Sequence, residues 1–319
     1  MPDSHPENHL LQNPLIKKII FVICSLLCVS TFIAPPFALL LGLVVVNIFG
    51  NPFPEQSQKL SRILLQVSVI GLGFGMNIHS AIATSREGFS FTVVSLICTL
   101  IFGGLLGYFL KIDKKTSHLI SSGTAICGAS AIAAISPVIS AEGKQITVAL
   151  ATIFILNSVA LFLFPFIGHL LNLSQYQFGI WSGIAIHDTS SVVGAAGRYG
   201  SEALQIATTV KLARSLWIIP LTFMSAFLFK TSAKKVKIPY FILFFVLAMI
   251  LNSYVPQLAI VTPSLLTLSK LGITLTLFLI GAGLDKNGLK SVGPKPLLQG
   301  VLLWIFISLL SLYAVLHMF

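Results

Sequence analysis

Apolar residues dominate this chain in eleven runs, separated by short polar or charged stretches. The runs lie at 16–34, 37–49, 63–78, 89–110, 119–140, 146–171, 178–196, 206–229, 240–251, 265–284 and 297–318. A transmembrane helix needs about 20 apolar residues, so the shorter runs at 37–49 and 240–251 suggest tilted or broken helices. The pattern predicts an all-α polytopic membrane protein with about eleven transmembrane helices. We expect one transmembrane domain over residues 15–319, after a polar cytoplasmic tail at 1–14.

Composition agrees with a membrane protein and narrows the function. The chain is 55% hydrophobic and 9% charged, whereas a soluble domain carries about 25% charged residues. No HExxH, GxSxG or Walker A motif occurs in the sequence, so we expect neither an enzyme nor an ATP-driven pump. The four cysteines lie in apolar runs without metal-ligand spacing, so we expect no metal or other cofactor.

The lysines and arginines predict an orientation, because cytoplasmic loops are enriched in them. With a cytoplasmic N-terminus and one crossing per run, fourteen cations lie inside: Lys17, Lys18, Lys59, Arg62, Lys111, Lys114, Lys115, Lys230, Lys234, Lys235, Lys237, Lys286, Lys290 and Lys295. Only Arg86, Lys144 and Arg198 lie outside. We therefore expect the N-terminus in the cytoplasm and the C-terminus outside.

An internal repeat at an offset of 208 residues suggests two inverted copies. The tripeptide Leu60-Ser61-Arg62 recurs as Leu268-Ser269-Lys270, and each is followed at the same distance by a glycine-rich segment. Inverted repeats are typical of secondary transporters. The two glycine-rich segments favour helix packing or helix ends over ligand binding, and their matched residues are Gly73, Gly75 and Asn77 with Gly281, Gly283 and Asp285.

A second repeat, at an offset of 60 residues, relates two glycine-containing segments near residues 122–146 and 182–206. It predicts two similar broken helices that face each other. Two crossings between them would make the copies parallel, unless one of them is re-entrant.

The two broken segments carry most of the candidate substrate-binding residues. An unwound helix exposes backbone N–H groups that favour an anion, and hydroxyl groups add donors. The first segment contributes Thr124, Cys127, Gly128 and Ser130, and the second contributes His187, Asp188, Thr189, Ser190 and Ser191. Gly123, Pro137 and Gly194 are expected to break or pack the helices rather than to bind substrate. The alternative is tight packing of small residues between helices. His187 is either a protonation switch or a packing residue.

Three cations lie within predicted spans. Lys211 and Arg214 share one helix face, and Lys270 lies in a later span. Asp188 is the acid expected to offset one of them, which leaves a surplus of positive charge. An arginine fork suits a bidentate oxyanion such as sulfate, sulfite, a sulfonate or a carboxylate. The alternative is a buried pair of Arg214 with Asp188 that holds two helices together.

The motifs SSGTAICGASAIAA, EGKQ, IHDTSSVVGAAG and GAGLD resemble the YeiH family of bacterial inner-membrane proteins, which is catalogued as a sulfate-exporter family. The resemblance covers nearly the whole chain after the tail. It implies a fold related to bile-acid–sodium symporters and sodium–proton antiporters, with interleaved panel and core subdomains and crossing broken helices. The paired aspartates of the antiporters are absent, since only His187-Asp188 occurs here.

These patterns predict a secondary transporter of a small oxyanion that acts by alternating access, and the resemblance implies that it exports its substrate. The alternative is a sodium- or proton-coupled carrier of an organic acid, like the bile-acid symporters. A channel and a homodimer stay open, and the net charge of +11 reflects topology rather than nucleic-acid binding.

Overall fold

The computed structural model describes residues 14–30, 33–230, 240–284 and 292–318, and every element in these ranges is helical. The elements are α2 (Pro14–Cys28), α3 (Pro35–Phe49), α4 (Pro54–Gly73), α5 (Ile78–Phe109), α6 (Lys114–Ala125), α7 (Ala129–Ile135), α8 (Gly143–Leu170), α9 (Gln175–Ala185), α10 (Thr189–Tyr199), α11 (Ser201–Ser215), α12 (Ile218–Leu228), α13 (Tyr240–Tyr254), η1 (Pro256–Ile260), α14 (Thr262–Gly281) and α16 (Pro294–Met318). Each predicted run overlaps one helix or a consecutive pair, although α4 begins nine residues before its run, at Pro54.

Five stretches are long and apolar enough to cross a membrane: Ser90–Phe109, Gly143–Leu170, Ser201–Leu228, Thr262–Gly281 and Pro294–His317. The shorter apolar helices α3 and α13 match the two short runs of the sequence. The prediction of an all-helical membrane protein is confirmed at this level.

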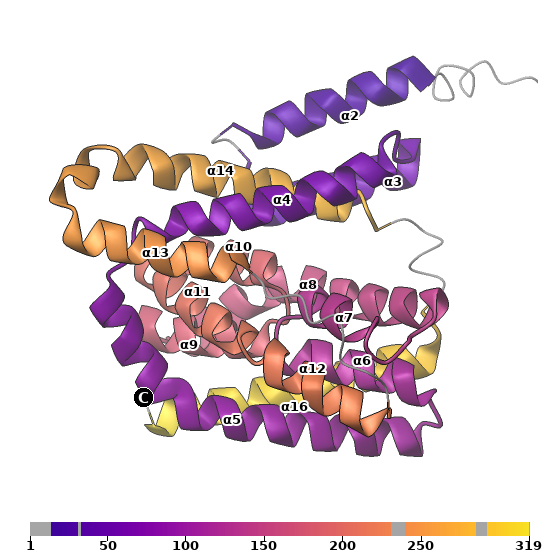
Figure 1. The fold of residues 1–319 in the computed structure, drawn as a ribbon. Coiled ribbons are helices and arrows are strands. Elements are labelled where there is room, and N and C mark those ends of the chain that lie inside the picture. The colour runs from indigo at the N-terminus through magenta and orange to yellow at the C-terminus, as the bar shows by residue number, and fades with distance from the viewer. Residues whose placement is uncertain (1–13, 31–32, 231–239, 285–291, 319) are drawn as a thin grey trace, which may run out of the picture.

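The helices form two groups, which we call the panel and the hairpin block. The panel contains α2, α3, α4, α13 and α14, with α2 on its outer side, and the hairpin block contains α5 to α12 and α16 (Figure 1). Within the block, α6 and α7 lie toward one end of the long helices, and α9 and α10 lie toward the other (Figure 1).

The run that contains α6 and α7 folds back on itself. Lys115 Nζ at the start of α6 donates to the Ser140 carbonyl, 2.8 Å away, beyond the end of α7. Gln145 Nε2 at the start of α8 donates to Asp113 Oδ1, also at 2.8 Å. Because a straight helix would separate Lys115 from Ser140 by about 38 Å at 1.5 Å per residue, these contacts define a hairpin, the first hairpin (α6–α7).

The run that contains α9 and α10 folds back in the same way. The Tyr199 hydroxyl at the end of α10 donates to the Leu173 carbonyl, just before α9, at 2.6 Å. The Glu202 N–H donates to Gln175 Oε1 at 3.0 Å. This second hairpin (α9–α10) and the first differ from the expectation that every run crosses the membrane once. The chain breaks at 126–128 and 186–188 reverse its direction, and apolar length alone does not reveal a reversal.

Helix α8 places the two hairpins at opposite ends of the block. It has 28 residues, which is about 42 Å at 1.5 Å per residue. It begins beside the base of the first hairpin and ends beside the base of the second. Near its middle, Asn157 Oδ1 accepts the Asp188 N–H at 3.3 Å. The hairpins therefore enter from opposite ends, and the tip of the second reaches the middle of α8.

Local sequence signals start these helices. Asp113 caps α6 by accepting the N–H groups of Lys115 and Thr116 at 3.1 and 3.0 Å. Ser174 and Gln177 form a capping box at α9, and Glu142 and Gln145 form another at α8. Such caps satisfy the N–H groups that a helix start leaves free, and they fix the base of each hairpin.

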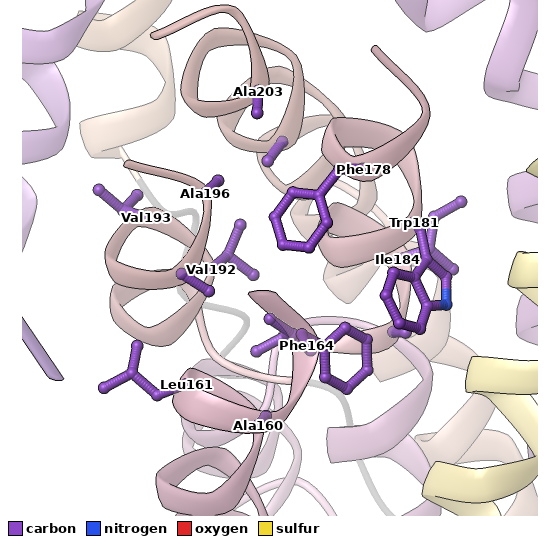
Figure 2. Close-up of a cluster of buried hydrophobic side chains, with 14 of the residues drawn as sticks. Ala160, Leu161, Phe164, Phe178, Trp181, Ile184, Val192, Val193, Ala196 and Ala203 are labelled. Atoms are coloured by element: carbon purple, nitrogen blue, oxygen red, sulfur yellow. The ribbon is translucent and has the colours of Figure 1, made fainter. Parts of the chain in front are cut away.

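Aromatic residues pack the second hairpin onto α8. Phe164 of α8 stacks on Trp181 of α9 with ring centroids 4.4 Å apart, and Phe178 stacks on Tyr199 at 3.8 Å. Figure 2 shows Val192 of α10 and Phe164 within the same buried cluster.

Small residues let α4 and α14 pack closely in antiparallel directions. A Cβ on Gly71 would lie 2.0 Å from Ser269 Oγ, and one on Gly272 would lie 2.1 Å from Ser68 Oγ. The residue numbers of the contacting pairs increase along α4, from Ser68 to Gly71, while they decrease along α14, from Gly272 to Ser269. The two helices that carry the matched tripeptides therefore cross each other.

The panel has an N-terminal half (α3 and α4) and a C-terminal half (α13 and α14). The matched glycines of each half contact a helix of the other half, and we call these the exchanged contacts. A Cβ on Gly73 of α4 would lie 2.8 Å from the Phe245 carbonyl oxygen of α13, and one on Gly281 of α14 would lie 2.1 Å from the Leu39 carbonyl oxygen of α3. Both glycines therefore occupy close helix contacts, each against a helix of the other half.

The remaining glycine-segment residues have separate surroundings. Gly75 faces the flexible side chain of Leu266. Asn77 Oδ1 accepts the His79 N–H at 2.8 Å near the start of α5. Gly283 is exposed after α14, and Asp285 lies outside the described residues.

Candidate functional site

The tips of the two hairpins meet inside the block. At the first tip, Gly128 has φ +62° and ψ −121°, a conformation that favours glycine. A Cβ at this position would lie 3.4 Å from the carbonyl carbon and oxygen of His187 in the second tip. Ile126 and Ile186, at matched positions 60 residues apart, end α6 and α9 with non-helical backbone.

Lys211 of α11 joins the two tips. Its Nζ donates to the carbonyls of Ile126 and Ile186 at 3.2 and 2.5 Å, and its side chain is 0% exposed. Both carbonyls lie at the C-terminal end of a half-helix, where the helix dipole favours a cation. One ammonium group thus binds the equivalent carbonyl in each hairpin.

Arg214, one turn later, reaches the first hairpin and α5. Its Nη2 donates to the Ala125 carbonyl and its Nη1 donates to Ser95 Oγ, at 2.5 and 2.9 Å. The side chain is 0% exposed, and its Nε has no hydrogen-bond partner among the described residues. The guanidinium is therefore held through Nη1 and Nη2, and Nε is the nitrogen left without a partner in this part of the chain.

Asp188 has a different role from the predicted ion pair. Its Oδ2 accepts the Ser190 N–H at 3.0 Å and also the Ser190 hydroxyl, so the carboxylate caps the start of α10. The hydrogen bonds described for Lys211 and Arg214 go instead to carbonyls and to a hydroxyl. A carboxylate stabilises a helix N-terminus through the dipole and the free N–H groups, which explains why it turns toward α10.

Several buried polar atoms around the tips have no hydrogen-bond partner in the described part of the chain. They are Thr124 Oγ1, Asn157 Nδ2, Arg214 Nε and both ring nitrogens of His187. Buried polar groups are nearly always paired, and each exception needs an explanation. A bound ligand or ordered water supplies the missing partners most directly.

The other candidate residues divide by exposure. The start of α10 is buried, with Thr189, Ser190 and Ser191 all below a tenth exposed. In the first hairpin, Cys127 is buried, whereas Ser130 and Pro137 are exposed.

Three further predicted residues lie outside the cluster of free polar atoms. Gly123 packs against Ile132 within the first hairpin, and Gly194 packs against Leu277 of the panel. Lys270 is exposed on α14, unlike the buried cluster, so it does not join the tips as predicted.

Two contributors were missed in the sequence. Asn157 is an amide in the middle of the apolar α8, and Ser95 is a hydroxyl within the apolar α5. An isolated amide in a long apolar run is itself a signal of a buried polar contact. Ser95 carries no such signal, because serines are common in apolar helices.

The arrangement combines two buried cations, one carboxylate and several free donors. Lys211 and Arg214 outnumber Asp188, so the tips carry excess positive charge in a water-poor environment where charge interactions are strong. Among the described residues no group of three His, Cys, Asp or Glu could hold a metal ion. The site is therefore suited to a small anion that accepts several hydrogen bonds.

Comparisons place the whole chain among membrane proteins. The family described as conserved hypothetical protein 698 matches residues 15–300. A UPF0324 membrane protein of Bacteroides thetaiotaomicron is 54% identical over 89% of this chain and 86% of its own length. Relatives from Photobacterium profundum and Geobacter sulfurreducens are 52% and 45% identical, over 92% and 94% of this chain and 90% and 96% of their own lengths. No solved structure matches the chain.

Proposed function

The chain belongs to the conserved hypothetical protein 698 family, the family that its hairpin motifs predicted, and we propose that it is a secondary transporter of a small oxyanion. The observation that carries the proposal is the meeting of two opposed hairpin tips around buried cations and unpartnered donors. Irregular backbone at membrane depth is tolerated only where protein or a watery cavity satisfies it. In transporters such breaks form the substrate site.

We propose that the two halves are inverted repeats. Nine runs then cross the membrane, and the two hairpins are re-entrant from opposite faces. The exchanged contacts of Gly73 and Gly281 support this arrangement. Asn47 and Asn252 also support it, because each donates a similar hydrogen bond near a helix end in the other half. Asn47 Nδ2 donates to the Leu284 carbonyl at 3.4 Å, and Asn252 Nδ2 donates to the Met76 carbonyl at 3.3 Å.

The re-entrant topology also improves the charge distribution. Lys144 follows the first hairpin and moves to the N-terminal side of the membrane. Fourteen inside cations become fifteen, and the three outside become two, Arg86 and Arg198. The positive-inside rule then favours a cytoplasmic N-terminus and an external C-terminus in a bacterial inner membrane.

We propose that the substrate belongs to the sulfate, sulfite or sulfonate class and is exported. Arg214 Nε, Thr124 Oγ1 and the ring of His187 are the free groups that would face its oxygens. Lys211 contributes charge while it holds the tips together. Movement of the hairpin block against the panel would expose the tips alternately to the two faces.

The second candidate is a sodium- or proton-coupled carrier of an organic acid. Asp188 favours it, because a buried carboxylate with a hydroxyl and an amide nearby offers oxygen ligands or a proton acceptor. The two candidates differ in whether binding of the anion requires sodium or a proton.

Thermal unfolding of the purified protein with anions distinguishes them. The anions tested are sulfate, sulfite, thiosulfate, taurine, phosphate and taurocholate. We expect one oxyanion class, and not taurocholate, to raise Tm equally as sodium and choline salts. A ligand at 100 times its Kd adds about 2.7 kcal/mol. Arg214→Lys should keep the fold but weaken binding about tenfold or more, since a hydrogen bond to a charged group contributes about 1.5–3 kcal/mol.

Arg198→Gln is the matched control, because Arg198 is exposed on α10 and its loss should leave the shift unchanged. A shift that needs sodium or appears only with bile-type acids would favour the second candidate. Equal shifts in wild type and Arg214→Lys would contradict the role of the guanidinium.

A further inference from the structure

We propose that Arg62 and Lys270 are matched cationic stations on the seam between the panel and the hairpin block. Each would attract the anion at one membrane face and pass it toward the hairpin tips. This inference rests on the proposed transport function and deepens it, because it assigns the path on each side. It also gives Lys270 a place separate from the tips.

The two cations occupy equivalent positions. Arg62 is the ninth residue of the 20-residue α4, and Lys270 is the ninth residue of the 20-residue α14. The antiparallel crossing set by Gly71 with Ser269, and by Gly272 with Ser68, places residues 66 and 274 opposite each other. Arg62 and Lys270 each lie one turn before the level of residues 66 and 274. Because the two helices are antiparallel, the cations lie on opposite sides of that level. Their separation along the helix axes is about 12 Å at 1.5 Å per residue.

On α4, Arg62 shares a face with two residues of a cluster that also includes residues of the hairpin block. It precedes Leu65 and Val69 by three and seven positions, which places all three on one side of the helix. Val69 is buried in one cluster with Leu212 of α11. The Arg62 side of α4 is therefore turned toward the seam.

On α14, Lys270 repeats this placement. It precedes Ile273 and Leu277 by three and seven positions, and both are buried in the cluster that contains the second hairpin. A Cβ on Gly194 of α10 would lie 3.1 Å from Leu277 Cδ1. Lys270 is thus directed to the same seam from the other helix.

The exposure of both cations favours a watery seam over lipid. Arg62 and Lys270 are exposed, and a cation facing lipid in mid-helix is strongly disfavoured. Gln66, one turn after Arg62, is also exposed, so a polar stripe continues along this face of α4.

The two hairpins differ in a way that fits access from one side. In the first hairpin Ser130 and Ala133 of α7 are exposed, whereas the matched Ser190 and Val193 of α10 are buried. In the proposed topology α7 and the Arg62 half of α4 lie on the same, N-terminal side. The Arg62 station thus belongs to the open side and Lys270 to the closed side.

A cation beside the path of an anion raises the local anion concentration and the association rate. We therefore expect Arg62→Gln to slow transport of radiolabelled sulfate or sulfite about tenfold when the anion is supplied at the N-terminal side. Lys270→Gln should do the same from the opposite side. Both effects should shrink at high ionic strength, and Tm and the anion-induced shift in Tm should stay at wild-type values.

Arg62→Lys and Lys270→Arg should restore the rates, and Lys144→Gln, at an exposed lysine at the start of α8, should leave them unchanged. Equal slowing from both sides, no slowing, or a loss of the anion-induced Tm shift would overturn the assignment.

A second measurement does not depend on transport. Arg62→Cys and Lys270→Cys are made in a variant without the four native cysteines and reacted with anionic and cationic thiosulfonates of similar size. We expect Arg62→Cys to react from the N-terminal side and Lys270→Cys from the other, with both reagents, because each substitution removes the cation that would favour the anionic one. Failure of transport alone would then count against the proposed substrate. Slow reaction of both cysteines would show that they face lipid and would overturn the stations.

Discussion

Lys211 illustrates how one side chain substitutes for regular backbone pairing. Each broken helix ends with carbonyls that have no following turn, and burial leaves them little access to water. The ammonium has three donors, and two of them serve Ile126 and Ile186. Because the same group holds both hairpins, they are mechanically joined at their tips and should move as one body with α11.

Gly128 is the residue whose backbone most restricts the first tip. We expect Gly128→Ala to lower the free energy of unfolding by about 1–3 kcal/mol, because a side chain in this backbone region is strained. The added Cβ would also press on Ile153, 3.1 Å away. Thermal unfolding measures the loss.

Gly104→Ala on α5 is the matched control, since a Cβ there meets nothing within 4 Å. Alanine should stabilise that helix position slightly. Equal Tm values for the two variants would mean that the tip tolerates a side chain.

At the scale of elements, the proposed re-entrant topology determines which loops share a membrane face. We expect Lys144→Cys and Lys114→Cys to react with an impermeant maleimide from the same side, and Arg198→Cys from the other. The bonds that join Lys115 to Ser140 and Gln145 to Asp113 are the reason. All three positions are exposed, and labelling in oriented vesicles decides the result. If Lys144→Cys reacted from the same side as Arg198→Cys, the run that contains α6 and α7 would cross the membrane, and the re-entrant topology would be wrong.

The sequence located these elements but not their reversal. Apolar length identified every helical run, and the offset of 60 residues aligned the breaks at 126–128 and 186–188. A run of about 20 apolar residues can be a span or two short arms, and the contacts that distinguish them join residues at its two ends. Gln145 with Asp113 is such a pair, and neither residue signals it.

Only some residues of the site could be predicted from the sequence. Polar side chains in apolar runs, such as His187 and Lys211, are recognised in the sequence because burying them in a membrane costs free energy. Their partners are not, because backbone carbonyls such as those of Ile126 and Ala125 carry no sequence signal. Asp188 was therefore assigned to the cations, whereas the nearest free N–H groups belong to its own helix.

At the scale of the whole molecule, the panel depends on close contacts that occur in matched pairs. We expect Gly73→Ala and Gly281→Ala each to lower Tm, because the new Cβ would lie 2.8 and 2.1 Å from a backbone carbonyl oxygen and a helix would have to shift. Overpacking of this kind typically costs about 1–3 kcal/mol.

Gly75→Ala is a useful comparison, since its Cβ would meet only the movable side chain of Leu266. Its effect on Tm should be smaller than that of Gly73→Ala. If only one member of the matched pair destabilised the protein, the two panel halves would not be equivalent in packing.

The bond between Lys211 and Ile126 also has a consequence for biosynthesis. The two residues are 85 positions apart, and a ribosome that adds about 5–20 residues per second takes roughly 4–17 s to make that length of chain. During this interval the first hairpin exists without the ammonium group that completes its tip. We expect its open carbonyls to be hydrated or held by the insertion machinery during this interval, and the hairpin to settle into the protein only after α11 emerges. The order of translation thus makes the arrival of one lysine the step that allows the centre of the protein to close.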